Sequence, residues 1–255
     1  MKKLYESFKI AFSMYSKIPM PASDWSKENM RYAMCFFPMI GVVIGAILCG
    51  FYWLSERFLL GDLSRSSIFV LLPVIITGGI HLDGFLDTSD ALHSYQPVEK
   101  KLEILKDPHT GAFAIISCCC YFVLALGVWS EVNGKVIGIL AVGFILSRAL
   151  SGLSIVTFPM AKNSGLAATF SENASKKRVK ITMYVYILLC FGGMVVQDFL
   201  IGIVCFMSAI IVFFYYRHKS IKEFGGITGD LAGYFLQICE LAIGFVGILL
   251  NKIIA

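Results

Sequence analysis

Three aspartates at helical spacing give the strongest chemical signal in the sequence. Asp83, Asp87 and Asp90 follow one another at intervals of four and three residues, so a helix would carry all three carboxylates along one face. Like charges in that arrangement repel one another, and no basic residue stands among them. Proteins usually hold Mg²⁺ with one or two carboxylates and the phosphates of a substrate. The pattern predicts a catalytic magnesium site on these aspartates, with His81 as a further catalytic candidate; the alternative is a solvated, acid-rich helix end.

A second polar segment, residues 106–111, leads directly into a long apolar stretch. Lys106 can hold a phosphate group. Asp107 can cap the following helix or add a ligand to a metal ion, whereas for His109 we expect exposure at the membrane interface rather than catalysis. We assign Lys106, Asp107 and Gly111 to substrate binding.

Glycines dominate a third segment, residues 225–230, which opens the last apolar stretch. Glycine lets the backbone approach a ligand closely, and the N–H groups of a helix that begins here would attract an anion. Asp230 suits an anion only if a cation lies between them, so the segment is typical of metal-bridged phosphates. It predicts Asp230 as a fourth metal ligand; the alternative is a flexible turn with a capping aspartate. The residues assigned here to substrate binding are Gly225, Gly226, Thr228 and Gly229.

Two ionisable side chains stand inside apolar stretches. Arg148 and Glu240 each lie about ten residues from the polar end of their stretch, which is ~15 Å along a helix. Charged side chains inside a membrane are rare and are usually paired. We predict that these two residues form an ion pair at matched depth. The pair either stabilises the bundle or lines the substrate cavity. Both residues are therefore candidates for substrate binding.

The composition indicates what kind of protein positions these residues. Of the 255 residues, 57% are hydrophobic and 15% are charged, and the mean hydropathy is +0.76. A soluble domain has roughly 25% charged residues, so an ordinary cytosolic enzyme, a disordered chain and a disulfide scaffold are excluded. The net charge of +5 is small and dispersed, which argues against binding nucleic acid. The eight cysteines form no CxxC pair and are expected to be packing residues.

Long apolar stretches predict an all-α, polytopic membrane bundle of about seven transmembrane helices. A helix that crosses the membrane needs about 20 mostly apolar residues. A short further stretch, residues 67–80, spans only if its helix continues through His81 and Leu82 towards Asp87. The six stretches that fit by themselves are residues 33–53, 111–129, 136–158, 182–197, 199–216 and 231–250.

The chain reads as one domain, residues 1–255, whose beginning differs from the rest. Residues 1–30 are set apart because residues 4–18 space apolar side chains at three- to four-residue intervals, with lysines between them. This pattern is typical of an amphipathic helix on the membrane surface. The transmembrane bundle then occupies residues 31–255.

The basic residues predict the orientation of the bundle. With seven spans and the N-terminus inside, 17 of the 22 lysines and arginines fall in inner segments, as expected for the cytoplasmic side of a cell membrane. Arg57, Arg65, Lys135 and Lys252 fall outside. Three polar segments then face the cytoplasm as active-site loops, and these are residues 81–111, 159–180 and 217–230.

The order of these motifs resembles the cobalamin synthase family, the adenosylcobinamide-GDP ribazoletransferases. Residues 78–90 are similar to the family signature GGxHxDGxxDxxD, and residues 104–111 to its signature MKDxxxG. Residues 17–21 and 37–45, the pairs 147–148 and 165–166, and residues 225–230 match further landmarks in order. Two positions depart from the pattern, because many members have an acid where Leu82 stands and a second small residue after Gly111.

The resemblance implies a reaction in a prokaryotic cytoplasmic membrane. An alcohol of α-ribazole, or of its 5′-phosphate, attacks the phosphoanhydride of adenosylcobinamide-GDP, and GMP leaves. The resemblance also implies Mg²⁺ as the cofactor and contact with the lipid bilayer. It leaves both a single chain and a homo-oligomer possible. The alternatives are another intramembrane phosphoanhydride transferase of the CDP-alcohol phosphotransferase or prenyltransferase kind, and an ion-coupled transporter. The transporter is disfavoured because the acids cluster on one side and the chain has no internal repeat.

Overall fold

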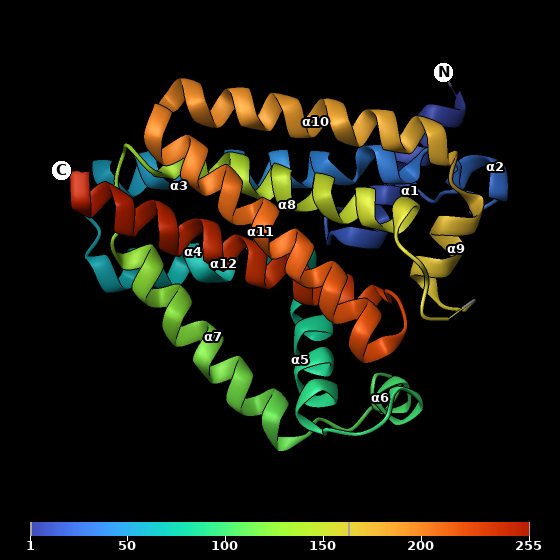
Figure 1. Ribbon diagram of the computed structural model, residues 1–255. Coiled ribbons are helices and arrows are strands. Elements are labelled where there is room, and N and C mark those ends of the chain that lie inside the picture. Colours follow the sequence, from blue (N-terminus) through green and yellow to red (C-terminus); the bar gives the residue numbers. More distant parts are fainter. Residues whose placement is uncertain (1, 163, 255) are drawn as a thin grey trace.

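The computed structural model describes residues 2–162 and 164–254, and its architecture is all-helical (Figure 1). The described residues contain no β-strand, and only an isolated parallel bridge joins Met160 to Ile227. The predicted all-α class is therefore confirmed. The elements are α1 (Lys2–Tyr15), α2 (Lys27–Met30), the 3-10 turn η1 (Ala33–Phe36), α3 (Phe37–Arg57), α4 (Asp62–Thr77), α5 (Ile80–His93), α6 (Val98–Ile104), α7 (Ala112–Ser130), α8 (Ile137–Thr157), α9 (Leu166–Asn173), α10 (Lys176–Gln197), α11 (Phe199–Phe224) and α12 (Gly229–Ile254).

Within the part of the chain that the structure describes, six helical segments are long and apolar enough to cross a membrane. They are Lys27–Arg57, which includes α3, together with α7, α8, α10, α11 and α12. In the apolar part of α8 83% of the residues are buried, against 22% in both α7 and α10. Helix α8 is thus the centre of the bundle, whereas α7 and α10 turn most of their apolar side chains outward, as helices facing lipid do. These features define a multi-pass membrane protein.

The short apolar stretch does not continue as one helix, so the expected straight seventh span is wrong. Helix α4 ends at Thr77, and α5 begins at Ile80 after a bend of 96°. Gly78 and Gly79 both have positive φ, 66° and 79°, a backbone conformation that favours glycine. Figure 1 shows α5 standing almost at right angles to α4. The pair forms a seventh crossing only as a broken span, and the aspartates occupy a separate short helix.

The amphipathic N-terminal segment is a helix, as predicted, and it packs on the chain itself. It ends at Tyr15, before the predicted limit of residue 18, and its buried face includes Ile10 and Phe12. The Tyr15 ring lies 4.5 Å from the Phe37 ring between centroids. Its apolar face therefore covers the start of α3, and its location at a membrane surface stays a prediction.

The segments predicted as cytoplasmic loops are helical over most of their length. Residues 81–111 contain α5 and α6, and residues 159–180 contain α9 and the start of α10. Residues 217–224 are the last turns of α11, so only residues 225–228 form a turn. The three segments nevertheless lie at one end of the bundle, because α7 and α12 start there while α8 and α11 finish there.

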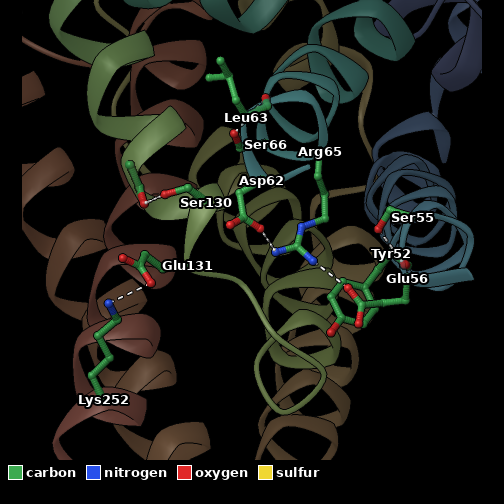
Figure 2. A network of polar contacts seen from close by, with 11 residues as sticks. Tyr52, Ser55, Glu56, Asp62, Leu63, Arg65, Ser66, Ser130, Glu131 and Lys252 are labelled. Atoms are coloured by element: carbon green, nitrogen blue, oxygen red, sulfur yellow. Dashed lines mark hydrogen bonds and ion pairs between the residues drawn. The ribbon is translucent and has the colours of Figure 1, made fainter. Parts of the chain in front are cut away.

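At the opposite end of the bundle, ion pairs join exposed acidic side chains to the half-buried Arg65 and to Lys252 (Figure 2). Arg65 donates to Glu56 at 2.6 Å and to Asp62 at 2.9 Å. Lys252 and Glu131 join the ends of α12 and α7 at 2.7 Å. Exposed pairs of this kind contribute little stability. This end holds Arg65 and Lys252, two of the four basic residues that the sequence assigns to the outer side.

Candidate active site

A cavity of about 450 Å³ lies at the end of the bundle where the three polar segments meet. Helix α5 supplies His81 and Asp83, and the segment after α6 supplies Lys106. The start of α12 supplies Asp230, and the segment after α8 supplies Lys162. The predicted convergence of the three polar segments is therefore observed, and both acidic and basic side chains line one cavity.

The cavity wall depends on a close crossing of α5 and α12. A Cβ on Gly84 would lie 2.7 Å from the Asp230 carbonyl oxygen, and one on Gly233 would lie 2.8 Å from the His81 carbonyl oxygen. These glycines let the two backbones touch, which brings the neighbouring Asp83 and Asp230 to the same cavity. Larger side chains at either glycine would push the two helices apart.

Four carboxylates, those of Asp83, Asp87, Asp90 and Asp230, gather around this crossing. Asp87 experiences the negative charges of Asp83, Asp230 and Asp90. None of the four belongs to an ion pair between described residues, and Asp230 accepts only a 3.3 Å hydrogen bond from the Thr228 hydroxyl. Mutual repulsion of this kind is relieved by a bound cation.

The donor set fits a magnesium ion that shares its coordination with a substrate. In residues 2–162 and 164–254, no group of three His, Cys, Asp or Glu side chains is close enough to hold a metal ion alone. Mg²⁺ does not require such a cage, because one or two carboxylates suffice when phosphates and water complete the shell. Asp83 and Asp230 both line the cavity, whereas Asp87 and Asp90 lie outside its lining.

Gly111 lies against the carboxylate of Asp90, at the beginning of α7. A Cβ added to Gly111 would overlap both carboxylate oxygens of Asp90. This contact gives Gly111 a packing function outside the cavity lining, and its assignment to substrate binding stays a prediction. The cap expected from Asp107 is wrong, because Gly111 is the N-cap of α7 and no side chain caps that helix. Asp107 instead accepts hydrogen bonds from His109 N at 2.9 Å and Nδ1 at 2.7 Å, which lower the Asp107 pKa.

Lys162 is a cavity residue that the sequence reasoning counted only as a basic charge. Its ammonium group donates a 2.7 Å hydrogen bond to the Leu102 carbonyl oxygen of α6. Burial lowers the pKa of Lys162, the charge of Lys106 lowers it further, and Asp230 opposes both effects. The three charged groups are therefore near neighbours. The sequence offered one signal, since Lys162 stands three residues before the glycine at 165 that marks a family landmark.

A short backbone pairing places Lys162 next to the start of α12. Ala161 N–H donates to the Ile227 carbonyl oxygen at 3.0 Å, and Ile227 N–H donates to the Pro159 carbonyl oxygen at 2.8 Å. Gly226 packs on this pairing, because a Cβ there would lie 2.6 Å from backbone atoms of residues 159–161. Gly225 ends α11 in the left-handed conformation, with φ 75°. The two glycines thus have structural reasons to be present, while Thr228 and Gly229 line the cavity.

We expect the substitution Gly226→Ala to destabilise the protein by about 1–3 kcal/mol, because the added methyl overlaps backbone that cannot rotate away. Thermal unfolding in detergent would measure the effect. Gly50→Ala is the matched control, since a Cβ on Gly50 meets no atom within 4 Å. Equal unfolding temperatures of the two variants would contradict the packing assigned to Gly226.

Aromatic side chains form another side of the cavity. The His81 ring stacks on Tyr15 with 6.2 Å between centroids and meets the edge of Phe37 at 5.8 Å. Only 5% of His81 is exposed, and its Nε2 atom is enclosed without a hydrogen-bond partner. Tyr15 was not predicted as a cavity residue, because a surface helix was expected there. The cavity thus combines charged groups with a flat, apolar surface.

Arg148 and Glu240 form the predicted ion pair inside the bundle. The guanidinium nitrogen and the carboxylate oxygen are 2.7 Å apart, and Ser147 donates a further hydrogen bond to Glu240 at 2.8 Å. Neither charged residue lines the 450 Å³ cavity, whereas Glu240 borders a separate space of about 40 Å³ beside Tyr121. The pairing is confirmed, and a role in substrate binding stays a prediction.

Fold and cavity together define an integral membrane protein with a charged cavity at one end of its helical bundle. The chain belongs to the cobalamin-5-phosphate synthase family, whose model matches residues 7–248. This membership confirms the resemblance found in the sequence motifs. It decides against both the other transferase families and the transporter.

Two relatives illustrate the similarity. A protein of Lachnoclostridium phytofermentans is 45% identical over 252 residues, which cover 99% of this chain and 97% of the relative. A protein of Clostridium perfringens is 34% identical over 264 aligned positions that cover both chains completely. Both relatives are named adenosylcobinamide-GDP ribazoletransferase. No solved structure matches the chain.

Proposed function

We propose that this protein is an adenosylcobinamide-GDP ribazoletransferase. A hydroxyl of α-ribazole, or of its 5′-phosphate, attacks the phosphorus on the corrinoid side of the phosphoanhydride. The bond to GMP breaks, GMP leaves, and the new phosphodiester completes adenosylcobalamin or its 5′-phosphate. Full-length similarity to relatives with that name, at up to 45% identity, is the observation that carries the proposal.

The charged groups of the cavity suit a displacement at a phosphoanhydride. Such reactions gain mostly from positioning of the reactants and from stabilisation of negative charge. Mg²⁺ supplies charge neutralisation and Lewis acidity when bound, and Asp83 and Asp230 would hold it, with Asp87 and Asp90 close by. Lys106, which lines the same cavity, would bind a phosphate oxygen.

The attacking hydroxyl must lose a proton, and residues that line the cavity can receive it, Asp83 and His81 among them. Asp83 and His81 both border the cavity, so either group can lie within hydrogen-bond reach of a bound hydroxyl. Asp87 and Asp90 lie outside the lining, and Asp87 experiences the negative charges of Asp83, Asp230 and Asp90.

The orientation proposed for the enzyme puts the cavity on the cytoplasmic side of the cell membrane. It is supported by the 17 basic residues that fall on that side of the span pattern. An amphipathic corrinoid can then approach along the membrane surface, while the nucleotide end enters the polar cavity. All residues named in the proposed reaction come from one chain, so the reaction does not depend on the number of subunits.

Purified protein in lipid nanodiscs tests the activity and its metal requirement together. With adenosylcobinamide-GDP, α-ribazole and Mg²⁺, we expect equal amounts of GMP and adenosylcobalamin. Chelation with EDTA is expected to lower the rate at least about 1,000-fold, because several kcal/mol of charge stabilisation are lost, and added Mg²⁺ should restore it. Absence of both products from folded protein would refute the proposed activity, and full activity in EDTA would refute the metal requirement.

A further inference from the structure

We propose that Lys162 binds the diphosphate of the substrate together with Lys106, so that the cavity contains a two-lysine anion site. This inference rests on the proposed function and deepens it. It assigns to Lys162 a role in substrate binding, whereas the sequence reasoning counted this lysine only as a basic charge. It also names the chemical class of the ligand, a substituted diphosphate.

The first support is the rigid position of Lys162. The bridge between Met160 and Ile227 fixes the two residues that precede Lys162 against the turn before α12. Lys162 therefore extends from a held backbone beside Thr228 and Asp230, which line the same cavity. A charged group held in this way loses less conformational freedom when it binds a ligand.

The second support is the hydrogen bond from Lys162 to α6. An ammonium group has three donors, and one of them binds the Leu102 carbonyl oxygen at 2.7 Å. The remaining donors are available to the cavity, which Lys162 lines together with Lys106. The bond also joins the segment after α8 to the helix that directly precedes Lys106, so the two lysines are positioned relative to each other.

The third support is the charge balance inside the cavity. Neither lysine takes part in an ion pair between the residues that the structure describes. The charge of Lys106 acts on Lys162, and an anion between these two like charges removes their repulsion. A diphosphate carries enough charge to contact both lysines and still share a metal ion with Asp83 and Asp230. A single phosphate, such as that of α-ribazole 5′-phosphate, has the same chemistry but spans less of the site.

Lys162→Gln tests the proposal, with Lys101→Gln as the matched control. Lys101 also fastens α6, through an ion pair with Glu223, but it does not line the cavity. Binding of inorganic pyrophosphate with Mg²⁺, measured by calorimetry in detergent, is expected to weaken roughly tenfold or more in Lys162→Gln, as for a lost charged hydrogen bond. Lys101→Gln should stay within about twofold of the unchanged protein, and Lys162→Arg should retain most of the affinity because the charge remains.

Steady-state kinetics identify which substrate the lysine contacts. We expect Lys162→Gln to raise KM for adenosylcobinamide-GDP and to leave KM for α-ribazole and for its 5′-phosphate unchanged. A rise confined to α-ribazole 5′-phosphate would overturn the proposal, because Lys162 would then hold the acceptor. Unchanged pyrophosphate binding, or equal losses in Lys162→Gln and Lys101→Gln, would also overturn it, and in either case the proposed reaction would still stand.

Discussion

Asp83→Asn is expected to lower the turnover of adenosylcobinamide-GDP at least about 1,000-fold, because it removes a ligand of the magnesium ion that we propose at the reacting centre. Asp83 is exposed on the cavity wall, so the isosteric amide should fit without repacking. Its neighbour Gly84 packs on α12 and is unchanged. The loss should therefore appear in kcat, while expression and the unfolding temperature stay near those of the unchanged protein.

The appropriate control is an aspartate at the other end of the bundle. Asp62→Asn removes an exposed ion pair with Arg65 (Figure 2), which contributes little to stability, and it should keep full activity. The rates come from GMP release in nanodiscs at saturating substrate. Near-normal activity of Asp83→Asn would contradict the metal assignment, and an equal loss in Asp62→Asn would point to a general effect of charge.

Arg148→Met is expected to destabilise the bundle by about 3–5 kcal/mol, because it leaves the Glu240 carboxylate buried without its partner. The side chains of Arg148 and Glu240 are 1% and 10% exposed, and an unpaired charge inside an apolar bundle is costly. Thermal unfolding in detergent measures the change. The double variant Arg148→Met/Glu240→Gln removes both charges and is expected to regain most of the lost stability.

Activity of the double variant separates the two roles left open for the pair. Because neither residue lines the 450 Å³ cavity, we expect the double variant to recover turnover along with stability. A stable double variant without activity would instead favour a role in substrate binding. A double variant no more stable than either single variant would contradict the energetic coupling of the two side chains.

The positions of the membrane helices could be predicted from the sequence, whereas the break between α4 and α5 was missed. A bilayer demands about 20 apolar residues in each span, so the length requirement located six helices. That same requirement favoured extending residues 67–80 into one long helix. The adjacent Gly78 and Gly79 were the local signal against it, and their positive φ values end α4.

Within the site, the positions that depend on local spacing in the sequence could be predicted, whereas those that depend on contacts between distant segments could not. The spacing of Asp83, Asp87 and Asp90 correctly placed all three on one helix, and matched depth correctly paired Arg148 with Glu240. The cavity position of Lys162 depends on a backbone bridge between residues far apart in the chain. No local pattern encodes such a pairing, so its contribution required the structure.

The most direct test of the account is an experimental structure of the protein in nanodiscs with adenosylcobinamide-GDP and Mg²⁺, without the acceptor. We predict the diphosphate inside the cavity between α5 and α12, with its oxygens within hydrogen-bond distance of Lys106 and Lys162. The metal ion should bridge the diphosphate to Asp83 or Asp230. A diphosphate bound outside this cavity, or bound there without contact to either lysine or either aspartate, would contradict the account.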